Sequence, residues 1–359
     1  MTDTQLSAEG EAEVYQSFRH FWHPVAYSSD VESQPTAVRL CDTDIVVVRL
    51  GGRVRAFADL CPHRGARLSL GWVEEDQIRC AYHGWSYDGD GICTLIPSCL
   101  DQRIPAKARL RSYLCVESGG LVWVCLEDVP RFGIPPFQEH GDPAYRVVQI
   151  PPVDWNAGAA RRIENFVDLA HIPWIHDGQL GSRDRPEAPM HDLVREADNI
   201  HMWGHFSEIQ SIKTDSSQLD ESDPTLTSNH NWRVYMPLTV WWQQSLPGDQ
   251  FFGLLVAASP VSQNVTRTFM LNFRNFALED PDAPFCRFQM EIAEQDRQIV
   301  ESQRPEELPV DLTAELHVRT ADRMSLEYRR WLVELKHELS DGGSENRLRI
   351  HSEAGNYAT

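Results

Sequence analysis

Apolar and polar residues alternate over short stretches in the first part of the chain, between Ala37 and about Asp128. Alternation with a period of two is typical of half-buried β-strands, and pairs such as Gly51-Gly52 separate the stretches as turns. The pattern therefore predicts a small antiparallel β-domain with strands at Ala37–Cys41, Ile45–Leu50, Val54–Leu60, Gln77–Cys80, Trp85–Asp88, Leu110–Val116 and Leu121–Leu126.

Prolines crowd the next segment, with six of them between positions 130 and 152. Proline lacks a backbone N–H and interrupts regular structure, which indicates a linker. Beyond it, the pattern predicts a helix after Asn156, then strands and two more helices. The strands are expected at Ile200–Ser211, Asn231–Pro237, Thr239–Ser245, Phe251–Ser259 and Thr266–Phe276, and the helices at Ala283–Gln303 and Leu312–Leu339.

These elements predict an α+β protein made of two lobes, a β-rich domain and a domain with an antiparallel sheet flanked by helices. We expect an N-terminal helical segment at 1–36 that packs on the second lobe, the first domain at 37–150, the second at 151–340 and a flexible tail at 341–359. Thr214–Ser228 is rich in polar residues and is expected either as a lid over a pocket or as an unstructured loop.

Composition excludes several classes of partner. The net charge of −20 comes without a cluster of Lys and Arg, which argues against nucleic acid and suits a basic protein partner or simply solubility. No apolar run is long enough to span a membrane, and Met1–Gly10 is polar and acidic, unlike a signal peptide. We therefore expect a cytoplasmic protein that does not bind membranes.

Four residues of the β-rich domain have the spacing of metal ligands, in the pattern Cys61-x-His63-x16-Cys80-x2-His83. This set suits a tetrahedral structural zinc or a two-iron, two-sulfide cluster with thiolates on one iron and imidazoles on the other. In zinc fingers a cysteine pair usually precedes a histidine pair. Here each loop supplies one cysteine and one histidine, so each iron can take one ligand from each loop, and this order favours the cluster.

The sequence around these ligands resembles the Rieske iron–sulfur domain, because both loops fit its C-x-H-R-G and C-x-x-H-G-W pattern. Glycines in such loops let backbone N–H groups approach bridging sulfides. The resemblance implies a [2Fe–2S] cluster on the four ligands. It also implies that hydroxyl groups of the kind offered by Tyr82 and Ser86 donate hydrogen bonds to the cluster.

A second set of candidate ligands lies in the predicted helix after Asn156. Spacings of four and seven residues would place Asp168 and His171 on the same helical face as Glu164. Pro173 is expected to end that helix, so that His176 can turn back toward His171. Two histidines need a carboxylate to complete the facial triad that holds Fe(II) with open positions.

Asp296 is the candidate for that carboxylate. An apolar stripe runs along the predicted helix Ala283–Gln303 from Phe285 to Ile299, and Asp296 falls on it, three residues before Ile299. A carboxylate that points inward must be paired, protonated or bound to a metal.

At this point the whole chain resembles the Rieske non-haem iron oxygenases. Their motif N-x-x-D-x-x-H-x4-H is matched position by position by Asn165, Asp168, His171 and His176. The segment around Asp296 matches their late ligand motif, although Gln295 stands where an acidic residue is frequent. The resemblance implies a mononuclear Fe(II) on His171, His176 and Asp296, with catalytic roles for Asp168 and Asn165.

The resemblance also implies partners and a reaction. Electrons would come from NADH through a flavin- or iron–sulfur-containing reductase, with or without a ferredoxin, and Asp168 would join His171 to His83 of a neighbouring subunit in a head-to-tail homotrimer. Phe18–Val25, Ile104–Ala108 and Tyr328–Leu332 are similar to the mono-oxygenases that remove N- or O-methyl groups, with the methylxanthine N-demethylases as the nearest match.

We therefore expect the terminal oxygenase of a Rieske system, which hydroxylates or demethylates a small aromatic or heterocyclic substrate with O2 and NADH. Two alternatives stay open, namely a ring cis-dihydroxylating dioxygenase and an electron-transfer protein with an inactive binding lobe. The pocket walls are expected from alternate strand positions, although core packing explains these residues equally well: Leu238, Val240, Trp242, Phe252, Leu254 and Leu271.

Overall fold

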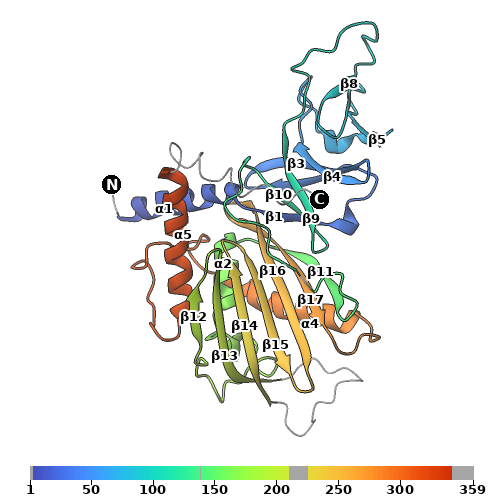
Figure 1. Ribbon diagram of the computed structural model, residues 1–359. Coiled ribbons are helices and arrows are strands. Elements are labelled where there is room, and N and C mark those ends of the chain that lie inside the picture. The colour runs from blue at the N-terminus through green and yellow to red at the C-terminus, as the bar shows by residue number, and fades with distance from the viewer. Residues whose placement is uncertain (1–2, 138, 210–224, 342–359) are drawn as a thin grey trace.

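The computed structural model describes residues 3–137, 139–209 and 225–341, which form two lobes (Figure 1). The N-terminal lobe contains two antiparallel sheets. The larger has the strand order β1-β10-β9-β4-β3-β2 and the smaller β5-β6-β7-β8. The larger sheet consists of β1 (His23–Tyr27), β2 (Thr36–Leu40), β3 (Thr43–Leu50), β4 (Arg53–Ala58), β9 (Ser112–Ser118) and β10 (Leu121–Cys125). The smaller consists of β5 (Trp72–Glu74), β6 (Gln77–Arg79), β7 (Ser86–Tyr87) and β8 (Cys93–Leu95) and lies in a projecting tip (Figure 1).

The second lobe is built on one antiparallel sheet with the strand order β11-β17-β16-β15-β14-β13-β12. Its strands are β11 (Arg146–Trp155), β12 (Asp192–Arg195), β13 (Asn199–Ile209), β14 (Thr225–Tyr235), β15 (Thr239–Leu246), β16 (Gln250–Ser262) and β17 (Val265–Arg274). The helices are α1 (Asp3–Ser17), α2 (Ala159–Val167), α3 (Ile172–Ile175), α4 (Ala283–Val300) and α5 (Arg323–Asp341), with short 3-10 helices at Phe18–His20, Ser28–Asp30 and Leu68–Leu70. In the described part of the chain, no helix combines the length and the apolar character that a membrane span requires.

The two faces of the large second-lobe sheet have different partners. Helices α2 and α4 cover one face, where Leu254 and Met270 pack against Ala293 of α4. The opposite face packs on the N-terminal lobe, and there Tyr27 of β1 donates its hydroxyl to the carbonyl oxygen of Ile150 at 2.6 Å. The sheet therefore joins the two lobes on one side and leaves the other side for the helices.

The proline-rich segment is not simply a linker, because β11 begins within it. Pro151 and Pro152 fall where the register between β11 and β17 shifts, between Ile150 and Val153. β11 is also the last strand of its sheet. An edge strand tolerates missing N–H donors at a bulge, so the prolines do not exclude a strand there.

Two helical expectations were too long. The helical part of the segment 1–36 ends at His20, apart from the short 3-10 helix Ser28–Asp30, since β1 follows and pairs with β10. The helical part does contact the second lobe, where Lys336 of α5 forms an ion pair with Glu13 at 2.9 Å. The C-terminal helix begins at Arg323 instead of Leu312, because side chains such as Asp311 bind nearby backbone N–H groups and compete with helix formation.

The polar loop expected at Thr214–Ser228 falls mostly outside the described residues. β14 already begins at Thr225, and the chain is described again from that strand onward. The expected tail at 341–359 lies, beyond Asp341, outside the described residues as well.

Candidate metal centres

The two loops expected to hold the first metal centre have the same backbone conformation at the tip of the N-terminal lobe. In each loop the cysteine N–H donates to the carbonyl oxygen five residues later, and the glycine N–H donates back to the cysteine carbonyl at 2.9 Å. Gly65 and Gly84 have φ of +73° and +69°, which only glycine adopts without cost. The sequence therefore builds two matching turns that face each other.

The side chains of this centre separate by type. Cys61 and Cys80 are almost fully buried, whereas His83 is exposed and its ring centroid lies 4.4 Å from that of His63. Burial raises the pKa of the Cys80 thiol, and so does its hydrogen bond with Cys61. Nδ1 of His63 is buried and has no hydrogen-bond partner among the described residues. Two inner sulfurs, two outer imidazoles and an unpartnered ring nitrogen fit a [2Fe–2S] cluster.

A hydroxyl group lies beside this centre, but it belongs to Tyr87. Its oxygen is 3.2 Å from Sγ of Cys61, and the side chain is fully buried. Ser86 instead donates to the carbonyl oxygen of Gly84, and Tyr82 is 62% exposed with its ring over His83. Successive side chains of a strand point to opposite faces, so Tyr87 and Ser86 of β7 point away from each other, and both are fully buried.

The second centre is built around the single-turn helix α3. α2 ends at Val167, before His171, and Pro173 lies in the first turn of α3. The expected break at Pro173 was therefore wrong, since proline is well suited to a helix start. His171 precedes α3 and His176 follows it, so one helical turn brings the two imidazoles together.

Asp296 of α4 completes this centre. Its Oδ1 lies 3.3 Å from Nε2 of His171 and 3.1 Å from Nε2 of His176. One ligand atom from each of the three residues fits within 4.8 Å of the others, and Asp296 is only 5% exposed. Two imidazoles and one carboxylate form the donor set of non-haem Fe(II) sites.

Neighbouring polar groups orient these three side chains. Nδ1 of His176 lies 2.7 Å from Oε1 of Gln295, which can only accept, so Nδ1 carries a proton, and Nε2, on the side of Asp296, is the atom that would bind a metal. Nδ1 of His171 lies 3.5 Å from Oδ2 of Asp168. The amide of Asn165 donates to Oδ1 of Asp296 at 3.3 Å. Gln295 therefore serves as an orienting acceptor where an acidic residue is frequent.

The electrostatics of the centre favour a charged carboxylate. Burial raises the pKa of Asp296, but hydrogen bonds from the two histidines and the charge of Arg162 hold it well below its ordinary range. Burial lowers the pKa of His171, yet hydrogen bonds to Asp168 and Asp296 raise it to about 9 overall.

The six candidate pocket residues do not share one face of the sheet. Val240, Trp242 and Leu254 point toward the helices, and the first two pack against the core around α2. Leu238 and Phe252 are buried as well. The prediction that Leu271 lines the pocket was wrong, because Leu271 pairs with Leu255 on the opposite face of the sheet, in the core between the lobes.

A row of aromatic side chains lies on the helix-covered face, and the sequence analysis named only its members Trp242 and Phe252. The rings of Phe206 and His230 stack at 4.2 Å, and the row continues through Trp232 and Trp242 to Phe252. Burial lowers the pKa of His230 to about 3, so this imidazole is uncharged. Alternation along β14 could have grouped His230 with Trp232.

Comparisons with known proteins agree with both halves of the chain. A Rieske [2Fe-2S] domain matches residues 21–113, and a vanillate O-demethylase oxygenase C-terminal domain matches residues 155–338. The chain is 33% identical to methylxanthine N1-demethylase NdmA of Pseudomonas putida over 332 residues, which cover 90% of this chain and 91% of the relative. It is 31% identical to methylxanthine N3-demethylase NdmB of the same organism over 335 residues.

Solved structures show the same relationship. NdmA from Pseudomonas putida CBB5 with caffeine matches with a TM-score of 0.80 and 31% identity, over 92% of this chain and 94% of that chain. Dicamba monooxygenase bound to dicamba shares the fold, with a TM-score of 0.77 and 21% identity. The expected fold class is thereby confirmed, and members of this family work with a reductase on small-molecule substrates. The chain belongs to the Rieske non-haem iron oxygenases and is an oxygenase component, a mono-oxygenase that carries a [2Fe–2S] cluster and a mononuclear iron and draws its electrons from NADH through a reductase.

Proposed function

We propose that this oxygenase removes a methyl group from the nitrogen or oxygen of a small, uncharged aromatic or heterocyclic substrate. The cluster is held by Cys61, His63, Cys80 and His83, and the mononuclear iron by His171, His176 and Asp296. The observation that carries the proposal is the convergence of one ligand atom from each of His171, His176 and Asp296 within 4.8 Å of one another, at the boundary between helices α2, α3 and α4. Asn165 and Asp168 are the catalytic residues that flank this centre.

The bound metals supply one-electron transfer and activation of dioxygen. The chain's own residues prepare the site for this. Gln295 accepts a hydrogen bond from Nδ1 of His176 and fixes that ring, while Oδ2 of Asp168 lies 3.5 Å from Nδ1 of His171 and interacts with it electrostatically. Asp168 also accepts a hydrogen bond from the backbone N–H of Ala170 at 2.8 Å, and this bond holds its carboxylate beside His171.

Demethylation follows from hydroxylation of a methyl C–H bond. One oxygen atom of O2 enters the substrate, and the other leaves as water, with two electrons from NADH and two protons. An N-methyl group becomes N–CH2OH, and an O-methyl group becomes O–CH2OH. The C–N or C–O bond then breaks, formaldehyde leaves, and the heteroatom keeps a proton.

The lining of the helix-covered sheet face supports an uncharged, planar substrate. Aromatic rings dominate the row from Phe206 to Phe252, and His230 within it is uncharged. Flat rings pack favourably against such a wall. The curated relatives NdmA and NdmB are named for methylxanthines, which are planar heterocycles with N-methyl groups.

We further infer that the chain works as a head-to-tail homotrimer in which Asp168 connects His171 to His83 of a neighbouring subunit. The tip that carries the cluster loops projects away from the lobe that contains α2 and α4 (Figure 1). Asp168 and His171 line a surface pocket of about 200 Å³, so this side of the second centre is accessible to another protein.

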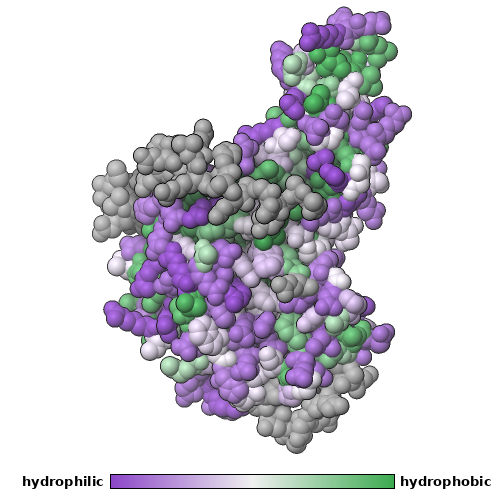
Figure 2. All heavy atoms as spheres, in the orientation of Figure 1, coloured by the Kyte–Doolittle hydropathy of each residue, from purple (hydrophilic) through white to green (hydrophobic). Residues whose placement is uncertain are grey.

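The surface of the tip supports such a contact. Figure 2 shows hydrophobic residues gathered on the projecting part of the N-terminal lobe. Leu70 and Leu100 are 73% and 72% exposed there, and Tyr82 beside His83 is 62% exposed. Exposed apolar side chains grouped in this way are typical of a contact surface.

The test of the reaction is product analysis. The purified oxygenase would be incubated with a compatible reductase, NADH and a panel of N-methylated heterocycles and aryl methyl ethers. Formaldehyde formed in proportion to the demethylated product is the expected result, and His171→Ala is the inactive control. A ring cis-diol, or a hydroxylated ring without formaldehyde, would contradict demethylation.

A further inference from the structure

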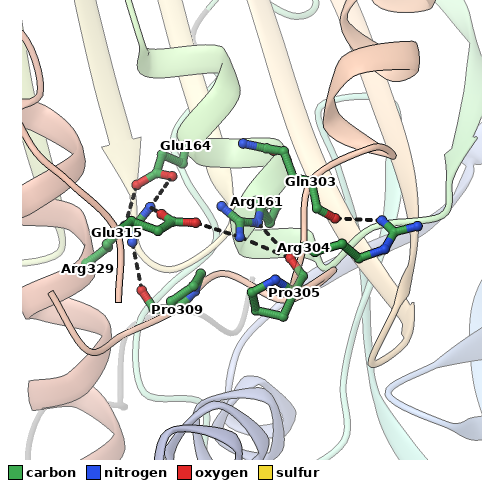
Figure 3. A network of polar contacts seen from close by, with 8 residues as sticks. All are labelled: Arg161, Glu164, Gln303, Arg304, Pro305, Pro309, Glu315 and Arg329. Carbon is green, nitrogen blue, oxygen red and sulfur yellow. Dashed lines mark hydrogen bonds and ion pairs between the residues drawn. The ribbon is translucent and has the colours of Figure 1, made fainter. Parts of the chain in front are cut away.

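Two adjacent arginines of α2, Arg161 and Arg162, are both only 2% exposed, but their surroundings differ. Arg161 belongs to a network that ties α2 to α5 (Figure 3). It donates to Glu315 at 2.9 Å and to the carbonyl oxygen of Pro305 at 3.0 Å. Arg329 of α5 binds both Glu164 and Glu315. In this network both buried arginines form ion pairs with carboxylates, and these ion pairs fix the position of α2 relative to α5.

Arg162 has no such carboxylate among the described residues. Its guanidinium carbon lies 4.5 Å from the ring centroid of Trp155 and 5.5 Å from that of Phe166, so two aromatic faces hold it. Its Nε is buried without a hydrogen-bond partner in the described part of the chain. Burial lowers the pKa of Arg162 to about 10, and the side chain is therefore still a cation at neutral pH.

One amide connects this cation to the second metal centre. Arg162 donates to Oδ1 of Asn165 at 2.8 Å, and Asn165 donates through Nδ2 to Oδ1 of Asp296 at 3.3 Å. Because a guanidinium has only donors, it fixes which end of the amide faces it. The Asn165 amide group is thereby turned toward the same carboxylate oxygen that faces both histidines.

We propose that Arg162 is a positioning residue of the mononuclear centre, which orients Asp296 through Asn165 and offsets its negative charge with a buried positive one. The inference rests on the proposed role of Asp296 as a ligand. A buried cation without an ion pair is costly, and here its charge acts on the nearby carboxylate. Groups that orient a metal ligand in this way usually change metal affinity when they are removed.

Metal binding provides a test that does not depend on turnover. The mononuclear metal is removed from the purified protein with a chelator while the cluster is kept, and Co(II) is titrated back with its visible spectrum as the readout. Arg162→Met should weaken Co(II) binding by about tenfold or more and change the ligand-field bands. Arg162→Lys, which keeps the charge and a donor, should recover a large part of the affinity.

A matched control comes from Arg274 of β17. Its side chain is fully buried, and its guanidinium carbon lies 3.9 Å from the ring centroid of Phe285, yet it contacts none of the proposed ligands. Arg274→Met should leave Co(II) affinity unchanged. Equal affinity of wild type and Arg162→Met, or an equal loss in Arg274→Met, would overturn the role of Arg162.

A second variant covers the case in which Arg162→Met does not fold. Asn165→Leu leaves the arginine in place and removes the connecting amide, so it should weaken Co(II) binding to a similar extent. Unchanged affinity in this variant would overturn the inference. If wild type itself failed to bind Co(II), the proposed metal site would be wrong, and this result is distinct from a failure of the Arg162 proposal.

Discussion

At the scale of single residues, the hydroxyl of Tyr87 is positioned to change the redox properties of the cluster. It lies 3.2 Å from Sγ of Cys61 and donates to the thiolate when the cluster is bound. Reduction adds negative charge, so this hydrogen bond stabilises the reduced state more than the oxidised state. Tyr87→Phe should lower the midpoint potential by tens of millivolts, as measured by spectroelectrochemistry.

The matched control for that variant is Tyr82→Phe, because the side chain of Tyr82 is mostly exposed and, among the described residues, its hydroxyl makes no hydrogen bond to the cysteines. The midpoint potential of the cluster in Tyr82→Phe should equal that of wild type. A Tyr87→Phe potential that is unchanged or higher would show that the hydroxyl does not act on the cluster.

Glu307 makes stability depend on pH. It is 7% exposed, and burial together with the charge of Glu11 raises its pKa to about 8, although Arg161 lowers it in part. A carboxyl group with a raised pKa holds its proton more tightly in the folded state. Stability should therefore fall as the pH rises from about 4.5 to about 8 and then level off.

Glu307→Gln should remove that dependence. At pH 8.5 the variant should be more stable than wild type, on the order of 3 kcal/mol, and near pH 4.5 the two should be similar. Urea unfolding at both pH values measures the difference. The neighbouring, more exposed Glu306→Gln is the control, and a Glu307→Gln advantage that does not change with pH would contradict this explanation.

Residue-scale features differ in how well the sequence predicts them. The cluster loops can be predicted because their turns are closed by hydrogen bonds within six residues, as between Cys61 and Ala66. Leu271 could not be placed, since the face of a strand depends on pairing with distant residues and one position reverses it. Tyr87 was missed for the same reason, as only the folded sheet shows which residue of β7 faces Cys61.

At the scale of elements, the apolar pattern of α4 predicted correctly that Asp296 points inward, although one residue of the predicted apolar stripe is exposed. Its buried residues are Phe285, Gln289, Ala293, Asp296 and Val300, whereas Ile299 of the expected stripe is 49% exposed. Asp296 is nevertheless buried, because it lies on the helical face that packs on the sheet and α2. Periodicity therefore locates an inward face only to within about one residue of rotation.

The conformation of the second cluster loop depends on a single glycine, Gly84. Gly84 has φ of +69°, and a Cβ there would lie 3.2 Å from Cγ of Pro97. Gly84→Ala should destabilise the lobe by about 1–2 kcal/mol through backbone strain. The occupancy of the cluster, measured as its visible absorbance per chain, should fall with it.

Gly133 provides the control for this variant, because a Cβ at that position meets no atom within 4 Å. Gly133→Ala should keep both the unfolding midpoint and the cluster absorbance of wild type. If Gly84→Ala behaved in the same way, the left-handed conformation of this loop would not be required for cluster binding.

At the scale of the whole molecule, the two metal centres lie in different lobes. The loops with Cys61 and Cys80 are part of the projecting tip, whereas His171 lies at the start of α3 on the other lobe (Figure 1). The sequence could predict each centre because each depends on short segments and one helix. It could not predict their relative position, which is set by contacts such as that between Tyr27 and the backbone of Ile150.

The proposed head-to-tail assembly predicts that defective subunits complement each other. His83→Ala removes a ligand of the cluster, and His171→Ala removes a ligand of the mononuclear iron, so each variant alone should be inactive. In mixed oligomers, an intact cluster of one subunit faces an intact iron of the next. Co-expression of the two variants should therefore restore part of the demethylation activity, measured as formaldehyde per chain.

In the proposed arrangement electrons pass between subunits, because the tip that carries the cluster loops projects away from the lobe that contains Asp168 (Figure 1). The double variant, His83→Ala with His171→Ala in one chain, is the control, since mixing it with either single variant leaves no intact pair of centres across a contact. Native mass spectrometry would establish that mixed oligomers form. Mixed oligomers of the two single variants that stay inactive would show that each chain uses its own cluster and that the trimer, if present, is not a path for electrons.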